Sequence, residues 1–419
     1  MKLTSAMLGH AERALDQLLQ FSAPADRVLS AYFRQHRTLG RSDRAFIAET
    51  CFTVLRRKRS LEALAGGSEP RRLLLAALLR VQGLSARVLG EITQAGEVAL
   101  LAPMRAVRLE DFPPAVRLDL PDWLWSRLVQ QHGDSEAREI AQGLLNGAPL
   151  DLRVNLAKIS RDEALATLRS AGIAAEPTRY SPAGIRLKEK PAINRHELFL
   201  SGAVEVQDEG SQLLAYLCAP RRGEMVADFC AGAGGKTLAL AMLMRGAGRI
   251  YAMDVSAKRL GELAPRAARA GVSNIQTLVL ADEDDLRARR LTGKLDRVLV
   301  DAPCSGFGTL RRNPDLKWRH GPDAIVELGD KQRRILRAAA RLVHPGGRLV
   351  YATCSVLDDE NEAVVADFSA SHPQFEALPC NDLLAAQRID LDTGAVLRLW
   401  PHRHATDGFF AAAFQRRPD

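Results

Sequence analysis

Closely spaced cysteines and long apolar stretches are both missing from this 419-residue sequence. Its six cysteines form no CxxC pair and stand at wide, irregular intervals, which argues against a zinc ribbon or a disulfide framework and fits reduced thiols. The longest apolar runs, residues 73–79 and 238–244, fall far short of the roughly 18 residues that a membrane helix needs. The first residues show no apolar stretch with a cleavage site, so no signal peptide is expected. We therefore expect a soluble, cytoplasmic protein without a metal site.

Long polar low-complexity tracts and internal repeats are also absent, and 47% of the residues are hydrophobic, enough for ordinary buried cores. The length suggests two or three domains. The net charge is +8 and the sequence pI is near 9.4. A basic balance favours polyanionic partners, above all nucleic acid, although surplus surface Lys and Arg give the same totals.

Residues 1–125 show apolar side chains at three- and four-residue intervals, which predicts a helical domain. Ser42, followed by Asp43, is the predicted N-cap of its third helix. Basic clusters occur at residues 56–59 and 71–72. Such clusters are usually solvated helix faces, and RNA contact is the alternative.

Residues 126–209 predict a linker helix and a small α/β subdomain. Prolines 113, 114 and 121 interrupt the helical pattern just before it. The pattern that follows predicts a strand, a helix and two further strands. Ser160 and Glu163 are predicted to form a capping box at the start of the helix.

Residues 210–419 alternate apolar strand patterns with amphipathic helices, which predicts a doubly wound α/β domain with a parallel sheet covered on both faces. One helix is expected over residues 257–271, and another begins near residue 330. Residues 396–404 and 407–417 are predicted to form two closing strands.

Polar residues fall where these strands end, and ligands of open parallel sheets bind outside the carboxyl ends of the strands. By chance a strand would end in an acid once or twice, so the series predicts one functional site. The series runs Asp228 to Lys236, Asp254, Asp282, Asp301 to Cys304, and Cys354.

The first of these turns reads FCAGAGGKT, and its glycines permit close approach of the backbone to a ligand. Asp254 follows about 20 residues later, the distance expected for an acid that binds ribose hydroxyls. A P-loop would need glycine where Cys230 stands, so an NTPase is disfavoured. A nicotinamide-dinucleotide site fits the spacing but gives the cysteines at the strand ends no role.

Two cysteines, Cys304 and Cys354, stand at adjacent strand ends, and Asp301 lies three residues before Cys304. Methylation of carbon 5 of cytosine needs such a set: a thiolate that adds to carbon 6, a second group that assists release, and an acid near the ring. Each cysteine alone would more often be a packed apolar residue. The sequence by itself does not rank the two thiols.

A base inside a duplex is out of reach of such a site, so the target must be unpaired or flipped out. Trp318 is a candidate for stacking on a base, and a packed core position is the alternative. The candidates for contact with RNA phosphates are Arg311, Arg312, Lys317, Arg319, Lys331 and Arg333.

Over roughly residues 120–416 the order of motifs resembles the RsmB/Sun-type RNA (cytosine-5) methyltransferases. The matching segments include VQDEGSQL, DFCAGAGGKT, DAPCSGFGTLRRNPDLKWR, YATCSVLDDENE and DGFFAAAF. The resemblance implies a class I methyltransferase fold preceded by an RRM-like subdomain. It makes Cys354 the nucleophile and Cys304 the residue that assists release, and it places Asp301 near the cytosine. The helices of residues 1–125 are loosely similar to the NusB-like domain of some members.

The resemblance also implies S-adenosyl-L-methionine as cofactor and RNA as partner, ribosomal RNA in preference to tRNA, for a protein expected to be monomeric. A non-catalytic RNA-binding or assembly factor on the same fold is the alternative from another class. One departure is that Gly232 and Ala233 stand where the family usually has Ala and Pro. The implied cofactor-binding residues are Cys230, Ala231, Gly232, Ala233, Gly234, Gly235, Lys236, Asp254, Asp282 and Asp301.

Overall fold

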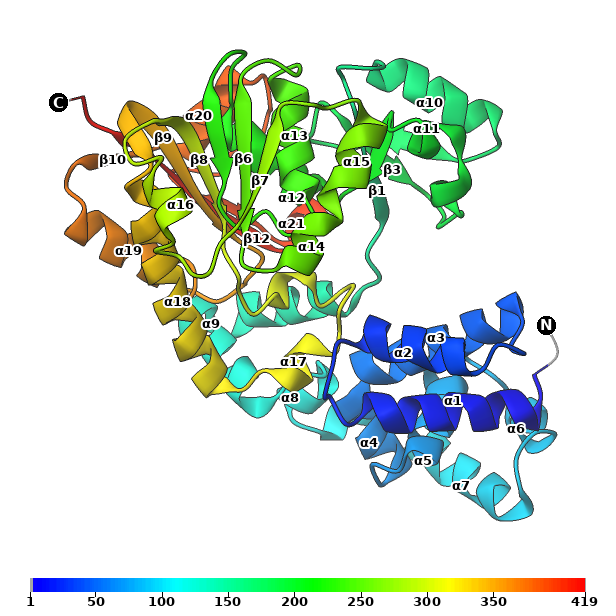
Figure 1. Ribbon diagram of the computed structural model, residues 1–419. Helices are drawn as coiled ribbons and strands as arrows, with labels where there is room; N and C mark the ends of the chain where they lie inside the picture. Colours follow the sequence, from blue (N-terminus) through cyan, green and yellow to red (C-terminus); the bar gives the residue numbers. More distant parts are fainter. Residues whose placement is uncertain (1–2, 419) are drawn as a thin grey trace. The chain divides into compact units, whose positions relative to one another are not determined.

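The computed structural model describes residues 3–418, apart from the side chain of residue 95, and the chain divides into two compact units (Figure 1). The first, here called the helical unit, contains the residues up to Gly147 and the segment Thr309–Pro322. The second, the α/β unit, contains Ala148–Gly308 and the residues from Asp323 onward. The boundaries of the three domains expected from the sequence stay a prediction.

The first unit consists of helices, as its apolar spacing predicted. Leu8 and Leu15 of α1 (Ser5–Leu18) pack in one core with Ile47 of α3 (Arg41–Arg56), and all three are fully buried. The other helices are α2 (Ala25–Gln35), α4 (Lys58–Ala65), α5 (Pro70–Ala76), α6 (Ala86–Gly90), α7 (Ala95–Ala106), α8 (Pro114–Arg117), α9 (Asp122–Leu145) and α17 (Leu316–Arg319), with single turns at Ala77–Val81 and Leu109–Asp111.

The predicted N-cap of the third helix was wrong by two residues. The N-cap of α3 is Gly40, not Ser42. The Asp43 carboxylate accepts a hydrogen bond from the Gly40 backbone N–H at 2.9 Å, which satisfies that donor from inside the first turn. Asp43 therefore stabilises the helix start through its charge and through the N-cap N–H, although Gly40 has no side chain to accept from the first turn.

The segment Thr309–Pro322 belongs to the helical unit although it lies between two strands of the other unit in the sequence. Trp318 Nε1 donates to the Leu55 carbonyl at 2.7 Å. Lys317 is buried, and its ammonium donates to the Arg56 carbonyl at 2.9 Å. These bonds reach the end of α3, so residues far apart in the sequence complete one unit.

The α/β unit begins with a four-stranded antiparallel sheet of order β2-β3-β1-β4. Helix α10 (Arg161–Ser170) packs on it and starts with the predicted capping box, in which the Ser160 hydroxyl accepts from the Glu163 N–H at 3.2 Å. Strand β2 was not predicted because only one of its three residues is buried. The elements are β1 (Leu150–Val154), β2 (Ala175–Pro177), β3 (Gly184–Leu187), α11 (Glu197–Leu200) and β4 (Val204–Val206), with a turn at Ile193–Arg195.

An eight-stranded sheet follows, ordered β10-β12-β9-β8-β5-β6-β7, with β11 paired to β12 outside this path. The five strands from β9 to β7 are mutually parallel, as predicted, and β12 and β10 run antiparallel to their neighbours. The strands are β5 (Met225–Asp228), β6 (Arg249–Asp254), β7 (Ile275–Val279), β8 (Leu295–Asp301), β9 (Val343–Thr353), β10 (Phe375–Leu378), β11 (Leu397–Leu399) and β12 (Phe409–Arg416).

Helices cover both faces of this sheet, so the unit is doubly wound (Figure 1). Alternate residues point to opposite faces: Val226 packs in the core with α12, α13 and α20, and Ala227 packs in the core with α16, α18 and α19. The helices are α12 (Glu209–Cys218), α13 (Gly235–Leu243), α14 (Ala257–Gly261), α15 (Leu263–Ala270), α16 (Leu286–Arg289), α18 (Pro322–Ala340), α19 (Glu362–Ser371), α20 (Cys380–Ala386) and α21 (Pro401–His404).

Three expected elements differ in the structure. The helix expected over residues 257–271 is two helices, α14 and α15, that meet at Glu262. The long helix α18 begins at Pro322 rather than near residue 330. The expected strand over residues 396–404 ends at Leu399, because Pro401 fits the first turn of helix α21.

Across the described part of the chain, the helices are too short or too polar to cross a lipid bilayer.

Candidate active site

Acids and a thiol lie at the carboxyl ends of the parallel strands, as predicted. β5 ends at Asp228, β6 at Asp254 and β8 at Asp301, while Cys354 directly follows β9 and Asp282 comes three residues after β7. From β5 the chain adds β6 and β7 on one side, and β8 and β9 lie on the other. Loops that leave a sheet in opposite directions open a crevice at this switch point, where ligands of such sheets bind.

A cavity of about 360 Å³ lies at this crevice. Its wall combines apolar side chains, among them Phe229, Leu280 and Ile335, with charged ones. A planar ring suits the apolar part, and hydroxyl groups or a positive charge suit the carboxylates. The predicted site residues that line the cavity are Cys230, Asp254, Asp282, Asp301, Cys304 and Cys354, whereas residues 231–236 of the glycine turn do not.

The glycine turn is held against the end of β6. The Gly232 N–H donates to the Asp254 carboxylate at 2.8 Å, and the Ala231 N–H donates to the Met253 carbonyl at 2.8 Å. Gly232 and Gly234 have φ of +56° and +83°, a region that favours glycine. A Cβ on Gly234 would lie 2.2 Å from the buried side chain of Leu263, so this position excludes larger residues.

Two arginines fix the part of the turn that departs from the family pattern. Arg266 Nη1 donates to the Ala233 carbonyl at 2.5 Å, and Arg153 Nη1 donates to the Gly235 carbonyl at 2.8 Å. Glu205 in turn pairs with Arg266 at 3.0 Å. Arg266 thus binds the carbonyl of Ala233, one of the two departing positions, and Arg153 binds the carbonyl of Gly235 two residues further on.

Lys236 connects the glycine turn to the cysteine strands. Its ammonium forms an ion pair with Asp301 at 2.6 Å. Burial alone would lower the pKa of Lys236, but the charge and hydrogen bond of Asp301, together with nearby Cys354 and Asp228, raise the pKa overall. Lys236 is therefore a fixed cation beside the site, where it favours negative charge.

The two cysteines predicted to act together are in contact. Cys304 Sγ and Cys354 Sγ are 3.3 Å apart, and both thiols are partly exposed to the cavity. The hydrogen bond to Cys354, followed by burial, raises the pKa of the Cys304 thiol well above its ordinary value. The two thiols are therefore close enough to share a proton, and the raised pKa of Cys304 favours its protonated form.

A buried carboxylate ties the two cysteine loops together. Glu360 is fully buried and accepts hydrogen bonds from the Ser305 N–H at 2.8 Å and the Ser305 hydroxyl at 2.6 Å. It also accepts from the Ser355 hydroxyl and from Gln332 Nε2 at 3.0 Å. Ser305 and Ser355 each directly follow one of the two cysteines. Glu360 therefore helps to set the separation of the two thiols, together with the bond from the Gly308 N–H to the Cys354 carbonyl at 2.8 Å.

Asp228 differs from the other acids of the rim because it is fully buried and does not line the cavity. The Thr237 hydroxyl donates to it at 2.7 Å. Burial, with a further contribution from the charge of Asp301, raises the pKa of Asp228 from 3.8 to about 7. Asp228 acts as a structural link between β5 and α13 rather than as a ligand of the cavity.

Comparison with known proteins places this site in a family. A model described as 16S rRNA methyltransferase RsmB/F matches residues 215–415, and a model of the RsmF/B-like ferredoxin-like domain matches residues 120–194. The chain belongs to the RsmB/F methyltransferase family. The matched ranges of this RsmB/F-family chain contain the whole cavity and both thiols.

Similar proteins agree with this assignment. A probable ribosomal RNA small subunit methyltransferase B from Synechocystis sp. is 36% identical over 300 residues, which cover 71% of this chain and 66% of that protein. A crystal structure of a methyltransferase homologue from Pyrococcus horikoshii is 30% identical, with TM-score 0.62, and the match covers 72% of this chain and 97% of that one. The crystal structure of PH0851 is 26% identical, with TM-score 0.79, and the match covers 99% of this chain and 100% of that one.

The structure corrects part of the predicted RNA-contact set of this RsmB/F-family chain. Arg311 and Lys317 are buried, so they cannot reach an RNA phosphate, and burial lowers the pKa of Lys317 to about 7. The indole N–H of Trp318 is bonded within the helical unit, which favours the packing alternative for this residue. Arg319 pairs with Asp315 at 3.5 Å. Lys331 lines the cavity and remains a candidate.

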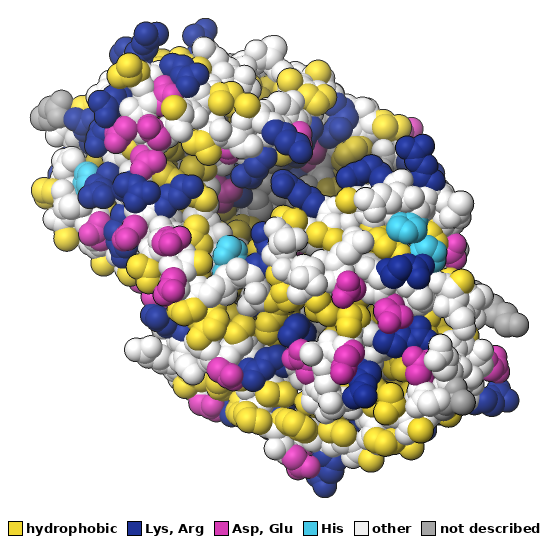
Figure 2. Space-filling view, turned by 60° about the horizontal axis from the view of Figure 1, so that its bottom comes forward, with side chains coloured by type: hydrophobic (Ala, Val, Ile, Leu, Met, Phe, Trp, Pro, Cys, Tyr) yellow, Lys and Arg dark blue, Asp and Glu magenta, His cyan; other side chains and the backbone are white. Residues whose placement is uncertain are grey.

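The basic clusters of the first helices are also engaged within their own unit. Arg59 pairs with Asp122 at 2.6 Å, and Arg71 pairs with Glu97 at 2.6 Å. On the face that Figure 2 presents, Lys and Arg side chains are interspersed with acidic and apolar ones. Arg59 and Arg71 are therefore paired within the unit, and contact of these clusters with RNA stays a prediction.

Several residues of this RsmB/F-family site were missed in the sequence. Arg259 and Glu283 line the cavity, and each follows a strand end by only a few residues, which is the signal that would have found them. Glu360 lies within the quoted motif YATCSVLDDENE, but nothing local distinguishes it from its acidic neighbours. Only its burial between the two cysteine loops reveals its role.

Proposed function

We propose that this chain transfers a methyl group from S-adenosyl-L-methionine to carbon 5 of a cytosine in RNA. The observation that carries the proposal is the contact between Cys304 and Cys354 on the wall of a cavity rich in carboxylates. Since the match spans 66% of the Synechocystis relative, the activity of the whole protein is proposed here from this site. The monomeric state and cytoplasmic location expected from the sequence stay predictions.

The cavity suits the cofactor in both size and chemistry. Asp254 would hold the ribose hydroxyls and Asp282 would bind the base, and the turn would approach the amino-acid part through Cys230, which lines the cavity. Apolar Leu280 and Ile335 would contact the adenine ring. When bound, the cofactor supplies an electrophilic methyl group on a sulfonium ion, a positive charge that Asp301 would balance.

Cys354 would act first, with its thiolate forming a bond from Sγ to carbon 6 of the cytosine. This addition makes carbon 5 nucleophilic, and carbon 5 takes the methyl group. A general base then takes the proton from carbon 5, and the electrons of that C–H bond re-form the ring double bond while the bond from carbon 6 to Sγ breaks and returns Cys354 as a thiolate. Cys304 stands 3.3 Å from that sulfur and would assist this release.

Two substitutions test this assignment. Cys354→Ala should abolish methyl transfer while calorimetry still detects cofactor binding, because Cys354 supplies the covalent bond and not the cofactor contacts. Cys304→Ala should slow release and accumulate an RNA–protein adduct on a denaturing gel. Cys380→Ala is the matched control, since this thiol is buried away from the cavity. Full activity of Cys354→Ala, or unchanged turnover without an adduct in Cys304→Ala, would defeat the proposal.

Ribosomal RNA is the substrate we propose, on the names of the relatives. Bisulfite sequencing of total RNA from cells with and without the gene tests this choice, because 5-methylcytosine resists deamination. A site lost from ribosomal RNA supports it. A 5-methylcytosine lost from tRNA instead would make tRNA the substrate of the same reaction. If no 5-methylcytosine is lost and the protein does not bind the cofactor, an assembly factor is favoured.

A further inference from the structure

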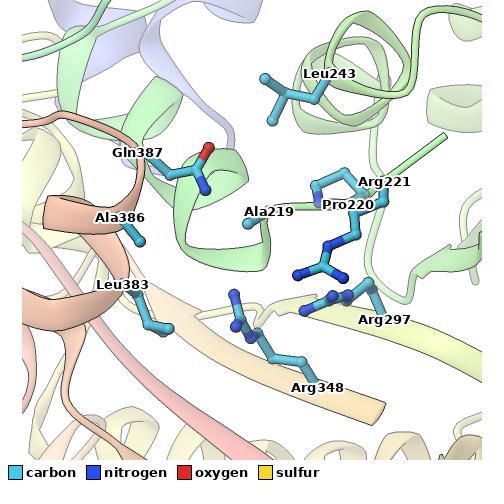
Figure 3. Close-up of a pocket in the computed structure, with 9 residues that line it drawn as sticks. All are labelled: Ala219, Pro220, Arg221, Leu243, Arg297, Arg348, Leu383, Ala386 and Gln387. Carbon is cyan, nitrogen blue, oxygen red and sulfur yellow. The ribbon is translucent and has the colours of Figure 1, made fainter.

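A second cavity of the α/β unit lies toward the amino end of β8, whereas the thiols follow the carboxyl ends of β8 and β9. Figure 3 shows the residues that line it. It has a volume of about 230 Å³ and is lined by Arg221, Arg297 and Arg348, with apolar side chains on the other walls. Arg297 lies four residues before Asp301 on β8, so roughly 13 Å of strand separates it from the active-site end of the same strand.

The sheet itself brings two of the arginines together. Arg297 and Arg348 are register partners on the parallel neighbours β8 and β9, so their side chains leave the same face side by side. Like charges at such a position destabilise a sheet. Figure 3 shows the Arg221 guanidinium turned toward the same space, opposite Leu243 and Leu383.

The positive charge of this cavity is only partly balanced. Glu224 forms an ion pair with Arg297 at 3.1 Å, whereas in the described part of the chain neither Arg221 nor Arg348 forms a salt bridge. Arg348 Nη1 donates to the Leu217 carbonyl at 2.9 Å, but its buried Nε has no hydrogen-bond partner within the described residues. Burial, with the charges of Arg297 and Arg221, lowers the pKa of Arg348.

We propose that Arg221, Arg297 and Arg348 form a binding site for a phosphate group. Guanidinium groups match phosphate oxygens in geometry and donate several hydrogen bonds at once. The cavity is smaller than the roughly 300–1,000 Å³ of sites for drug-sized ligands, so it would hold the phosphate group itself, and whatever the phosphate is attached to would lie outside. That phosphate comes either from an RNA backbone or from a small phosphorylated molecule. The proposal does not rest on the methyl transfer and is tested without it.

The test compares Arg221→Ala with Arg222→Ala in the full chain. Both arginines are exposed, but only Arg221 lines the cavity. The probes are inorganic phosphate and a single-stranded RNA oligonucleotide without terminal phosphates, each titrated at several salt concentrations. An exposed charge contact is worth about 1 kcal/mol, which corresponds to about fivefold in affinity. We therefore expect Arg221→Ala to bind phosphate about fivefold more weakly than the wild type, and Arg222→Ala to bind it as the wild type does. Arg348→Gln is the second variant, with its fold checked by circular dichroism.

The two sources separate in the RNA arm. One outcome is that Arg221→Ala binds RNA more weakly and that the slope of log affinity against log salt concentration becomes shallower by about 0.7. In that case the site binds an RNA backbone phosphate. If only phosphate binding weakens, the site takes a small phosphorylated molecule. Equal effects of Arg221→Ala and Arg222→Ala on both probes, or wild-type binding of both probes by Arg221→Ala, would overturn the proposal.

Discussion

Replacing Glu360 by alanine should separate the two catalytic loops, whereas replacing it by glutamine should not. In Glu360→Ala the Ser305 N–H loses its hydrogen-bond acceptor. The Ser305 hydroxyl still has its hydrogen bond with the Ser355 hydroxyl at 3.2 Å, and Gln332 Nε2 still donates to the Pro303 carbonyl at 3.0 Å. One orphaned buried donor costs about 1–3 kcal/mol, and loss of the charge-assisted bonds brings the expected destabilisation to about 2–4 kcal/mol.

Glu360→Gln preserves the geometry. One carboxylate oxygen accepts from the Ser305 N–H and from Gln332, and the amide oxygen can keep both bonds. The other oxygen accepts from the hydroxyls of Ser305 and Ser355, which can rotate and accept from an amide N–H instead. We expect a loss of only about 1 kcal/mol, the value of a typical hydrogen bond.

The difference should be larger in catalysis than in stability. A displacement of about 1 Å between reacting groups costs on the order of 100-fold in rate, and Glu360 helps to set the separation of Cys304 and Cys354. Single-turnover methyl transfer should therefore fall about 100-fold in Glu360→Ala and only a few-fold in Glu360→Gln. Thermal unfolding by circular dichroism measures the stability part. Equal rates in the two variants would refute the idea that this carboxylate positions the thiols.

Three further outcomes are expected from the glycine turn and from β5. In the wild type the Asp228 carboxyl has a pKa of about 7 when folded and 3.8 when unfolded, so between about pH 4 and about pH 7 it ionises only in the unfolded chain and the free energy of unfolding falls. Asp228→Asn lacks this loss, so its stability relative to the wild type should rise over the same range. Denaturant titration should show a gain of up to about 1.4 kcal/mol for each unit by which the two pKa values differ. Gly234→Ala should destabilise more than Gly235→Ala in thermal unfolding, by about 1–3 kcal/mol, since a Cβ collides with Leu263 at the first position and has its nearest neighbour at 3.7 Å at the second. Arg266→Gln should weaken cofactor binding in calorimetry, because the Ala233 carbonyl loses its charged donor, and unchanged affinity would show that the turn needs no such support.

The sequence predicted which residues meet at the carboxyl edge of the sheet, because their placement follows from the topology. Strand ends in a parallel sheet meet at one edge, so Asp254, Asp301 and Cys354 could be placed together before any coordinates were known. The Arg297 and Arg348 cavity escaped prediction because strand register is not visible in a single sequence.

Burial of charged residues was the other part that the sequence did not reveal. Lys317 and Arg311 lie in a strongly basic motif, which in a single sequence indicates an exposed surface. Their burial depends on residues more than 200 positions earlier, as the bond from Lys317 to the Arg56 carbonyl illustrates. Likewise, β2 has too few buried residues to produce an alternating pattern.

The membership of residues 309–322 in the helical unit bears on how this protein can be shortened. A truncated form starting at Ala148 would keep that stretch but lose the Leu55 carbonyl, which accepts from the Trp318 indole, and the Arg56 carbonyl, which accepts from Lys317. The segment that loses these contacts begins only five positions after Cys304. Excising the first 147 residues should therefore disturb the thiol chemistry, even though none of the excised residues supplies a thiol at the cavity.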